Sequence, residues 1–206
     1  MVNRKLSLIP GKLQSIFELL LEQILGFMDS VLGNRELSLR YMPIVGTVFI
    51  LILTSNWLGL LPFVGPLTVK EGLKSVPLFR SPSSDLNFTI ALAIISVLAV
   101  NIFGSVTIGL WKHLGKFFNF HSPIDFFTGI LEFVSEFIKI ISFSFRLFGN
   151  VFAGEVLLTI LGFLVPYAVP LPFIAMEIFV GLVQAFIFSM LTLVFIGMAV
   201  SHETAH

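Results

Sequence analysis

The chain has 206 residues, of which 56% are hydrophobic and only 12% are charged, whereas a soluble domain carries about 25% charged residues. This composition excludes an ordinary soluble protein and indicates an integral membrane protein of the helical kind, since the alternating pattern of barrel strands is absent. The formal net charge is zero and there is no cysteine, so nothing suggests a nucleic-acid partner, a disulfide or a cysteine-ligated metal.

The N-terminal region is predicted to contain one amphipathic helix. The first residues, MVNRKLSLIPGKLQ, lack the apolar core and cleavage site of a signal peptide, so we expect the first true span to direct insertion. Residues 11–33 place apolar side chains at helical spacing but also contain Lys12, Glu18, Glu22 and Asp29. We expect this helix either to lie on the membrane surface or to pack on a partner.

Two ordinary membrane spans are predicted next. The first covers 43–64, with Trp57 toward one interface, and the second covers 88–111 and ends at Trp111. The polar stretch between them, 65–87, contains prolines and basic residues and is predicted to be a loop.

Two longer helices are predicted to follow. Residues 126–165 are apolar for about 40 residues, and a helix of that length measures about 60 Å, twice the hydrocarbon thickness of about 30 Å. Because no turn signal interrupts 130–148, we expect one strongly tilted helix rather than two spans with a hidden turn. The last segment, 173–200, is also longer than a simple span requires. The predicted fold is therefore an all-α integral membrane protein, a single domain over 1–206, that ends in a hairpin of two long, tilted helices.

The basic residues predict the orientation of the chain. With four spans, seven basic residues fall on the N-terminal side and three on the other side: Arg4, Lys5, Lys12, Arg35, Arg40, Lys112 and Lys116 against Lys70, Lys74 and Arg80. We therefore expect both termini in the cytoplasm and the loop at 164–172 on the outer side. The membrane is expected to be a bacterial plasma membrane or, alternatively, an organellar energy-coupling membrane.

Arg146 stands within the apolar run SFSFRLFGNVFAGEVL, residues 142–157. An arginine stays charged in proteins, and placing it inside a membrane costs roughly a few kcal/mol or more. The nearest carboxylate toward the outer side, Glu155, is nine residues further on, so it points to the opposite face of the helix, about 13.5 Å along the axis. The two side chains cannot bond each other. We expect water, or a carboxylate on another chain, to compensate the charge of Arg146.

Other polar residues accompany Arg146 in the two long helices. Glu136 and Lys139 are three residues apart and can pair, which is the pattern of interfacial snorkelling. In the last helix Glu177 and Gln184 share one face, beside a row of small residues that permits close helix approach, namely Gly181, Ala185 and Ser189.

The expected depths of these residues form a pattern. Glu155 and Glu177 should both lie in the outer half of the membrane, Gln184 near the depth of Arg146, and Glu132 in the inner half. This is the layout of two half-paths for an ion, separated by a positive barrier. Simpler interpretations stay open: Glu155 and Glu177 as satisfied, neutral buried carboxyls, and the amides of Asn150 and Gln184 as interhelical hydrogen bonds. The four histidines, in loops or the tail, are expected to be solvated.

The motif SFSFRLFGNVFAGE resembles the most characteristic motif of the a subunits of F-type ATP synthases. The resemblance continues in PGKLQSIFELLLEQI, SSDLNFTIALA, LEFVSEFIKIISFSF and VGLVQAFIFSMLTLVFIGMAVSHE, and so covers nearly the whole chain. Family members commonly begin with a further transmembrane helix, whereas nine residues precede Pro10 here.

The resemblance implies roles for individual residues. Arg146 matches the essential arginine that faces the rotating c-ring. Further positions match polar residues of the proton path: Asn150, Glu155, Glu177 and Gln184 for the outer half, Glu132 for the inner half, and Asn87 as a possible polar lining.

The implied function is that of a non-catalytic stator subunit, which carries protons through two offset half-channels to and from c-ring carboxylates and so couples proton flux to rotation and ATP synthesis. The implied partners are the c-ring, the b subunits of the peripheral stalk and the lipid bilayer. No cofactor or metal is expected. The alternative is a self-contained secondary proton or cation transporter, for which the sequence lacks internal repeats and broken helices. A membrane anchor would not need Arg146, and a hydrolase would need a nucleophile and base that we do not find.

Overall fold

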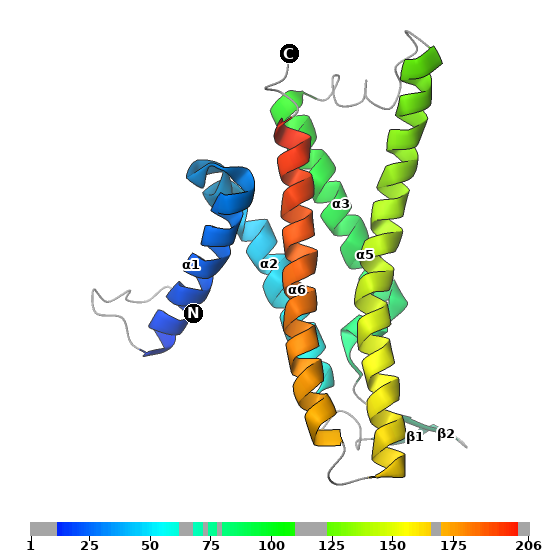
Figure 1. Ribbon diagram of the computed structural model, residues 1–206. Coiled ribbons are helices and arrows are strands. Elements are labelled where there is room, and N and C mark those ends of the chain that lie inside the picture. Colours follow the sequence, from blue (N-terminus) through cyan, green and yellow to red (C-terminus); the bar gives the residue numbers. More distant parts are fainter. Residues whose placement is uncertain are drawn as a thin grey trace.

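A computed structural model describes residues 12–61, 68–71, 74–77, 80–109, 123–165 and 170–201. Its elements, in chain order, are helices α1 (Lys12–Leu32) and α2 (Arg35–Gly59), strands β1 (Thr68–Glu71) and β2 (Lys74–Pro77), a 3-10 turn η1 (Pro82–Ser84), and helices α3 (Leu86–Ile108), α5 (Pro123–Leu164) and α6 (Pro170–Ser201). Figure 1 shows these elements coloured along the sequence.

Four of the described helices, α2, α3, α5 and α6, are long and apolar enough to cross a membrane. The predicted all-α membrane fold is therefore confirmed, including the two long C-terminal helices. Helix α5 is unbroken over 42 residues and α6 over 32 residues. At 1.5 Å per residue α5 measures about 63 Å, so it can only fit a bilayer of about 30 Å if it is strongly tilted or extends beyond it.

The ends of the two ordinary spans differ from the prediction for local reasons. Helix α2 begins at Arg35 rather than 43, because the side chain of Asn34 accepts a hydrogen bond from the Glu36 amide and caps the helix; Pro43 then lies inside it. Helix α3 ends at Ile108, because Gly109 adopts a positive φ of 95° that few other residues tolerate. Trp111, the predicted end of that span, lies outside the described residues.

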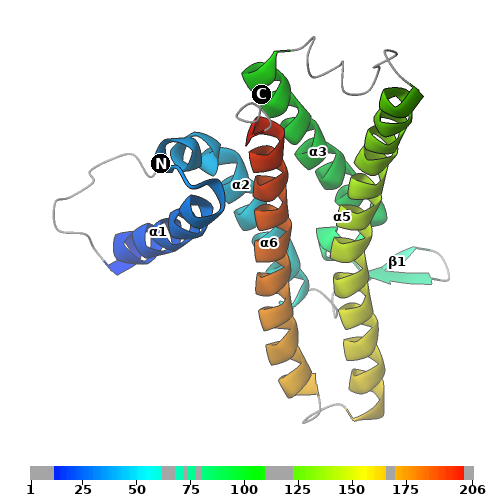
Figure 2. The same ribbon diagram turned by 45° about the horizontal axis from the view of Figure 1, so that its top comes forward.

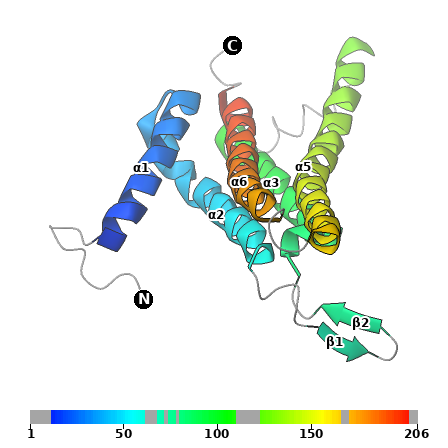
Figure 3. The ribbon, with the colours of Figure 1, turned by 60° about the horizontal axis from the view of Figure 1, so that its bottom comes forward.

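The region predicted as a loop at 65–87 contains regular structure. Strands β1 and β2 pair in an antiparallel manner, with Thr68 opposite Pro77 and Glu71 opposite Lys74. Figure 3 shows this hairpin projecting from the end of the bundle. The sequence did not predict these strands, because segments of four residues are too short to show a clear periodic pattern. The region is also rich in proline and charged residues, which are typical of loops.

Helix α6 packs against α2 on one side and against α3 and α5 on the other, as two views show (Figures 1 and 2). Helix α5 packs mainly against α3 and less against α6. Only 11% of the α5 span is buried, compared with 39% for each of the other three spans. Most of the surface of α5 therefore faces lipid or another protein.

The amphipathic helix α1 packs against α2 and α6. Ile24 and Met28 are its buried side chains, and an ion pair between Asp29 and Arg35, 2.5 Å long, joins its end to the start of α2. The sequence left open whether this helix lies on the membrane surface or packs on a partner. In the structure it packs on the protein's own spans α2 and α6.

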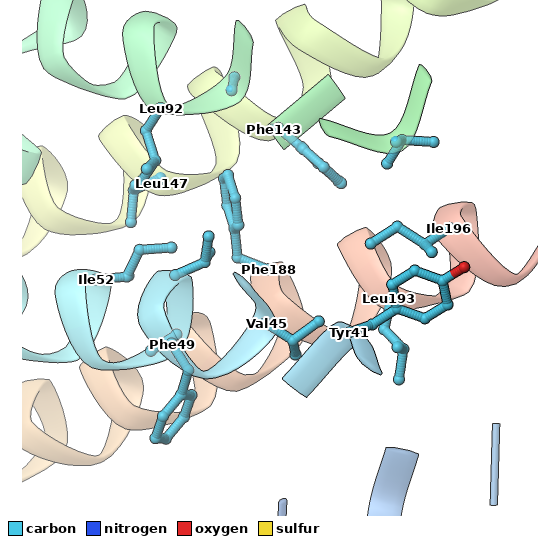
Figure 4. Packing of buried hydrophobic residues seen from close by; sticks show 14 of the residues in the cluster. Tyr41, Val45, Phe49, Ile52, Leu92, Phe143, Leu147, Phe188, Leu193 and Ile196 are labelled. Atoms are coloured by element: carbon cyan, nitrogen blue, oxygen red, sulfur yellow. The ribbon is translucent and has the colours of Figure 1, made fainter. Parts of the chain in front are cut away.

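The core is built from side chains of α1, α2, α3, α5 and α6, and Figure 4 shows residues of the last four converging. Phe143 and Leu147 are the buried contributions of α5, and Phe143 lies 4.7 Å from Phe188 of α6, measured between ring centroids. Because these two residues face the core, they set the rotation of α5 about its own axis. Arg146 lies beside them and is therefore held at the edge of the buried stripe.

Candidate functional site

Arg146 is partly buried on α5. Its Nη2 lies 3.4 Å from the Oγ of Ser142, one turn earlier in the same helix. Among the residues that the structure describes, no carboxylate lies within 4.0 Å of the guanidinium. The predicted separation from Glu155 is confirmed, because Glu155 pairs with a different cation. Arg146 therefore has a fixed charge and no acidic partner in the described part of this chain.

A cavity with both polar and apolar lining lies between α2, α5 and α6. Asn150 and Glu155 of α5 and Glu177 and Gln184 of α6 line it together with Asn56 of α2. The cavity has a volume of about 30 Å³. The four residues predicted for the outer half of the path thus meet around one cavity, although they are far apart in the sequence.

A hydrogen bond between two amides lies at the end of this cavity nearer to Arg146. Asn150 Nδ2 donates to Gln184 Oε1 over 2.8 Å. This is the interhelical hydrogen bond considered from the sequence. Asn150 lies one helical turn after Arg146, so Gln184 does return to the level of the arginine.

An ion pair lies at the opposite end of the cavity, toward the end of α5. Arg80 Nε donates to Glu155 Oε2 over 3.3 Å. Arg80 also lines a second, more open cavity of about 520 Å³, between η1, the start of α3 and α5. The position of Arg80 is fixed by its neighbour Ser81, which is buried and donates from Oγ to the Ser55 carbonyl of α2 over 3.0 Å. The pair therefore lies between the two cavities.

Glu177 is accommodated by a glycine on the opposite helix. A Cβ atom built on Gly154 of α5 would overlap the Glu177 carboxylate. The carboxylate consequently lies directly against the α5 backbone, one residue before Glu155. Any larger residue at 154 would have to displace it.

Two side chains at the end of α2 attach this helix to α6. Asn56 Nδ2 donates to the Gly181 carbonyl and Trp57 Nε1 donates to the Ile178 carbonyl, each over 3.2 Å. The predicted close helix approach at Gly181 is confirmed, since a Cβ there would lie 3.2 Å from the Asn56 Cβ.

A separate polar network connects α3 and α5. Lys139 Nζ donates to Glu136 Oε1 over 2.7 Å, and Asn101 Nδ2 of α3 donates to Glu136 Oε2 over 3.1 Å. Lys139 also lies over the ring of Phe195 of α6, 4.8 Å from its centroid. The predicted pair forms, and its side chains are partly covered by α3 and α6, with 16% of Glu136 and 24% of Lys139 exposed. The snorkelling interpretation stays a prediction.

Two predicted site residues lie apart from both cavities. Glu132 is exposed on α5, 23 residues or about 35 Å along the helix from Glu155. Asn87 is exposed in the first turn of α3, where its backbone amide donates to the capping side chain of Asp85. Their assignment to the proton path stays a prediction.

Sequence reasoning missed three residues at this site. Asn56 is the one amide side chain within the apolar span 43–64, and this position could have indicated a functional role. Arg80 was counted only for orientation, because nothing in the sequence places it beside Glu155. Nothing in the sequence distinguishes Gly154 except its position directly before Glu155.

The described residues contain no group of three or more His, Asp or Glu side chains that could hold a metal ion. The four histidines predicted to be solvated, His113, His121, His202 and His206, lie outside the described residues.

Comparison with known proteins gives one consistent family. A family model described as the ATP synthase A chain matches residues 1–197. A protein named ATP synthase subunit a from Moorella thermoacetica is 34% identical over 197 residues, which cover 96% of this chain and 81% of that protein. Its namesake from Campylobacter fetus subsp. fetus is 34% identical over 206 residues, with 100% and 84% covered. The one from Helicobacter pylori is 33% identical over 207 residues, with 99% and 83% covered.

Proposed function

Because the chain belongs to the ATP synthase A chain family, we propose that it is the proton-channel stator subunit of a rotary ATP synthase. It is a membrane protein and a component of the synthase complex. In this proposal the subunit performs no bond chemistry itself. It delivers protons to carboxylates on a ring of c subunits and collects them again, and the ring turns as a result.

The proposal rests on the environment of Arg146. Its charge is permanent, and the described part of the chain offers it no carboxylate. It also lies on the helix that the rest of the chain covers least. A carboxylate on a neighbouring protein that moves past this surface of α5 would supply the missing partner, and each step of the ring would replace it with the next.

The cavity between α2, α5 and α6 supports an outer half-path. Glu155 and Glu177 lie toward the end of the bundle where α5 and α6 are joined, and Asn150 and Gln184 lie further in, near Arg146. A proton that enters from the outer side is passed along these groups to a ring carboxylate, which becomes neutral and can then face lipid. After nearly a full turn it meets the inner half-path near Glu132 and releases the proton.

Arg146 separates the two half-paths in this mechanism. Its fixed charge repels a proton that would cross directly and attracts the ionised ring carboxylate. The length of α5 fits this role, since a long tilted helix can follow the curved wall of a ring. We further propose that both termini face the cytoplasm of a bacterial cell and that b subunits of the peripheral stalk hold the subunit stationary.

The test is proton conductance through membrane sectors stripped of their catalytic head, compared between wild type and Arg146→Ala. Gly162→Ala on the same helix is the control, because a Cβ there meets no atom within 4 Å. We expect Arg146→Ala to abolish proton-driven ATP synthesis in the intact complex and to leak protons in stripped sectors. An undiminished synthesis rate in that variant would contradict the proposal and favour a self-contained transporter.

A further inference from the structure

We propose that the open cavity between η1, the start of α3 and α5 binds the head group of a zwitterionic phospholipid of the phosphatidylethanolamine kind. In this site Arg80 binds the phosphate and Asp85 binds the ammonium group. Phe148 and Phe152 contact the apolar part of the lipid next to the head group. The inference concerns the chain as a membrane protein and does not depend on the proposed proton path.

The cavity lies at the boundary between the membrane and water. Helix α2 ends at Gly59 and α3 begins at Leu86, and η1 lies between them in the chain, outside the membrane-spanning helices. Irregular backbone is not exposed to the hydrocarbon of a bilayer, because its polar groups find no partners there. The turn η1, and the cavity beside it, therefore lie at the level of the lipid head groups.

A well-anchored turn brings Arg80 and Asp85 to the same cavity. Ser84 Oγ donates to the Ser81 carbonyl over 2.8 Å, and Ser81 Oγ donates to the Ser55 carbonyl of α2 over 3.0 Å. Both donating serines are buried. Arg80 and Asp85 flank this turn in the sequence, and both line the cavity. The backbone that carries the two charges is thus fixed before a ligand binds, which lowers the entropy cost of binding.

Arg80 retains hydrogen-bond donors for a phosphate. Its Nε donates to Glu155, but a guanidinium has N–H groups on all three of its nitrogens. The Nη groups of Arg80 make no hydrogen bond to the described residues, and its side chain is 55% exposed. Two parallel N–H groups of an arginine match two oxygens of a phosphate. Arg80 can therefore keep its pair with Glu155 and still bind a phosphate.

Asp85 offers a carboxylate oxygen to an ammonium group. Its Oδ1 accepts a hydrogen bond from the Asn87 amide and caps α3, which leaves Oδ2. Among the described residues no cation lies within 4.0 Å of this exposed carboxylate. The formal charge of Arg80, Glu155 and Asp85 together is −1. An anionic lipid would increase this excess, whereas a zwitterionic lipid supplies a group of each sign.

The cavity also has an apolar wall, which favours a lipid over free phosphate. The rings of Phe148 and Phe152, one turn apart on α5, stack with their centroids 5.2 Å apart, and Pro82 and Leu86 also line the space. The volume of about 520 Å³ falls within the range of about 300–1,000 Å³ that is usual for small-molecule sites. Free phosphate would leave most of this space empty, whereas a head group with its glycerol fills it.

The test is photo-cross-linking in the complete complex, reconstituted in vesicles that contain a photoactivatable phosphatidylethanolamine or a photoactivatable phosphatidylglycerol. Mass spectrometry measures the labelling of peptides that contain residues 148–152. We expect phosphatidylethanolamine to label them about three- to fivefold more than phosphatidylglycerol, which has the phosphate but no ammonium group. Equal labelling by the two lipids, or stronger labelling by phosphatidylglycerol, would overturn the inference.

Asp85→Asn isolates the contribution of the charge. Asparagine caps a helix as well as aspartate does, so this variant keeps the start of α3 intact. We expect it to lose the preference for phosphatidylethanolamine. Glu36→Gln, the same chemical change at an exposed position of α2, should keep the preference. An Asp85→Asn variant with the wild-type preference would show that the carboxylate does not bind the ammonium group.

Phe152→Ala tests the apolar wall. We expect it to lose most of the labelling by either lipid, whereas Phe163→Ala, at an 89% exposed position further along α5, should keep it. Wild-type labelling in Phe152→Ala would rule out a lipid seated against this wall.

Inorganic phosphate distinguishes a lipid from a free anion. Added in large excess over the lipid probe, it should leave the labelling unchanged, and displacement of the probe would show a site for free phosphate instead. This experiment and the comparison of the two lipids use the wild-type complex, so they decide the question even if a variant does not assemble. Neither measures proton flux, so a negative result would leave the proposed function intact.

Discussion

Gly154 of α5 and Glu177 of α6 face each other so closely that a Cβ atom at position 154 would overlap the Glu177 carboxylate. Gly154→Ala should therefore push this carboxylate out of its position. The overlapping atoms are the far end of a flexible side chain, so the shift should cost little stability, but a displaced group in a proton path slows transfer by about tenfold or more. ATP-driven proton pumping by reconstituted synthase measures the loss.

The same comparison has a control and a rescue. Gly162→Ala adds a Cβ on the same helix where no atom lies within 4 Å, and it should leave pumping unchanged. Shortening the opposing side chain, in Gly154→Ala combined with Glu177→Asp, should recover part of the activity. Full activity in Gly154→Ala alone would show that the Glu177 carboxylate is not held in this position.

The ion pair between Arg80 and Glu155 should have a modest effect. The side chain of Arg80 is 55% exposed, and exposed pairs contribute about 0–1 kcal/mol. Arg80→Gln should therefore lower proton uptake from the outer side by no more than about fivefold, while Arg80→Lys keeps most of it. Initial rates of proton-driven ATP synthesis at low and high salt provide the measurement, and the variant should be less sensitive to salt than wild type. Complete loss of synthesis in Arg80→Gln would show that Arg80 does more than position Glu155.

The network of Glu136, Lys139 and Asn101 should matter for stability rather than for flux. Glu136→Ala leaves the mostly buried Lys139 ammonium without its carboxylate, and we expect a loss of about 1–3 kcal/mol. The double variant Glu136→Gln/Lys139→Met removes both charges and should recover most of it. Thermal unfolding of the purified complex reports the difference. Conductance per folded complex should stay near wild type in both variants; a selective loss of conductance would instead place Glu136 in the inner half-path.

Arg146→Lys should not substitute for the arginine. A lysine can lose its proton in an apolar site and lacks the planar set of donors that meets a carboxylate in two places. We expect the complex to assemble and proton-driven ATP synthesis to stay at least about tenfold below wild type, a difference of about 1.4 kcal/mol in barrier. A wild-type rate would mean that any cation at this position is sufficient.

Much of the fold follows from the sequence because span length and hydropathy are local properties. The apolar run through 126–165 predicted an unbroken helix, and α5 is one. The helical repeat also separated Arg146 from Glu155 without knowledge of any other element. The boundaries were less accurate where one side chain decides them, as Asn34 does by capping α2 eight residues before the predicted start.

The partners of the polar residues were decided only by the tertiary structure. Helical spacing says which residues share a face, but not which residue of another helix lies opposite, because that depends on the rotation and offset of each helix. Packing of Phe143 and Leu147 into the shared core sets the rotation and the offset of α5. As a consequence Glu155 meets Arg80, Glu177 meets Gly154, and Asn56 reaches the cavity. The sequence thus determined that Arg146 lies in an apolar span without an acidic partner on its own helix, and the packing of the helices decided what surrounds it.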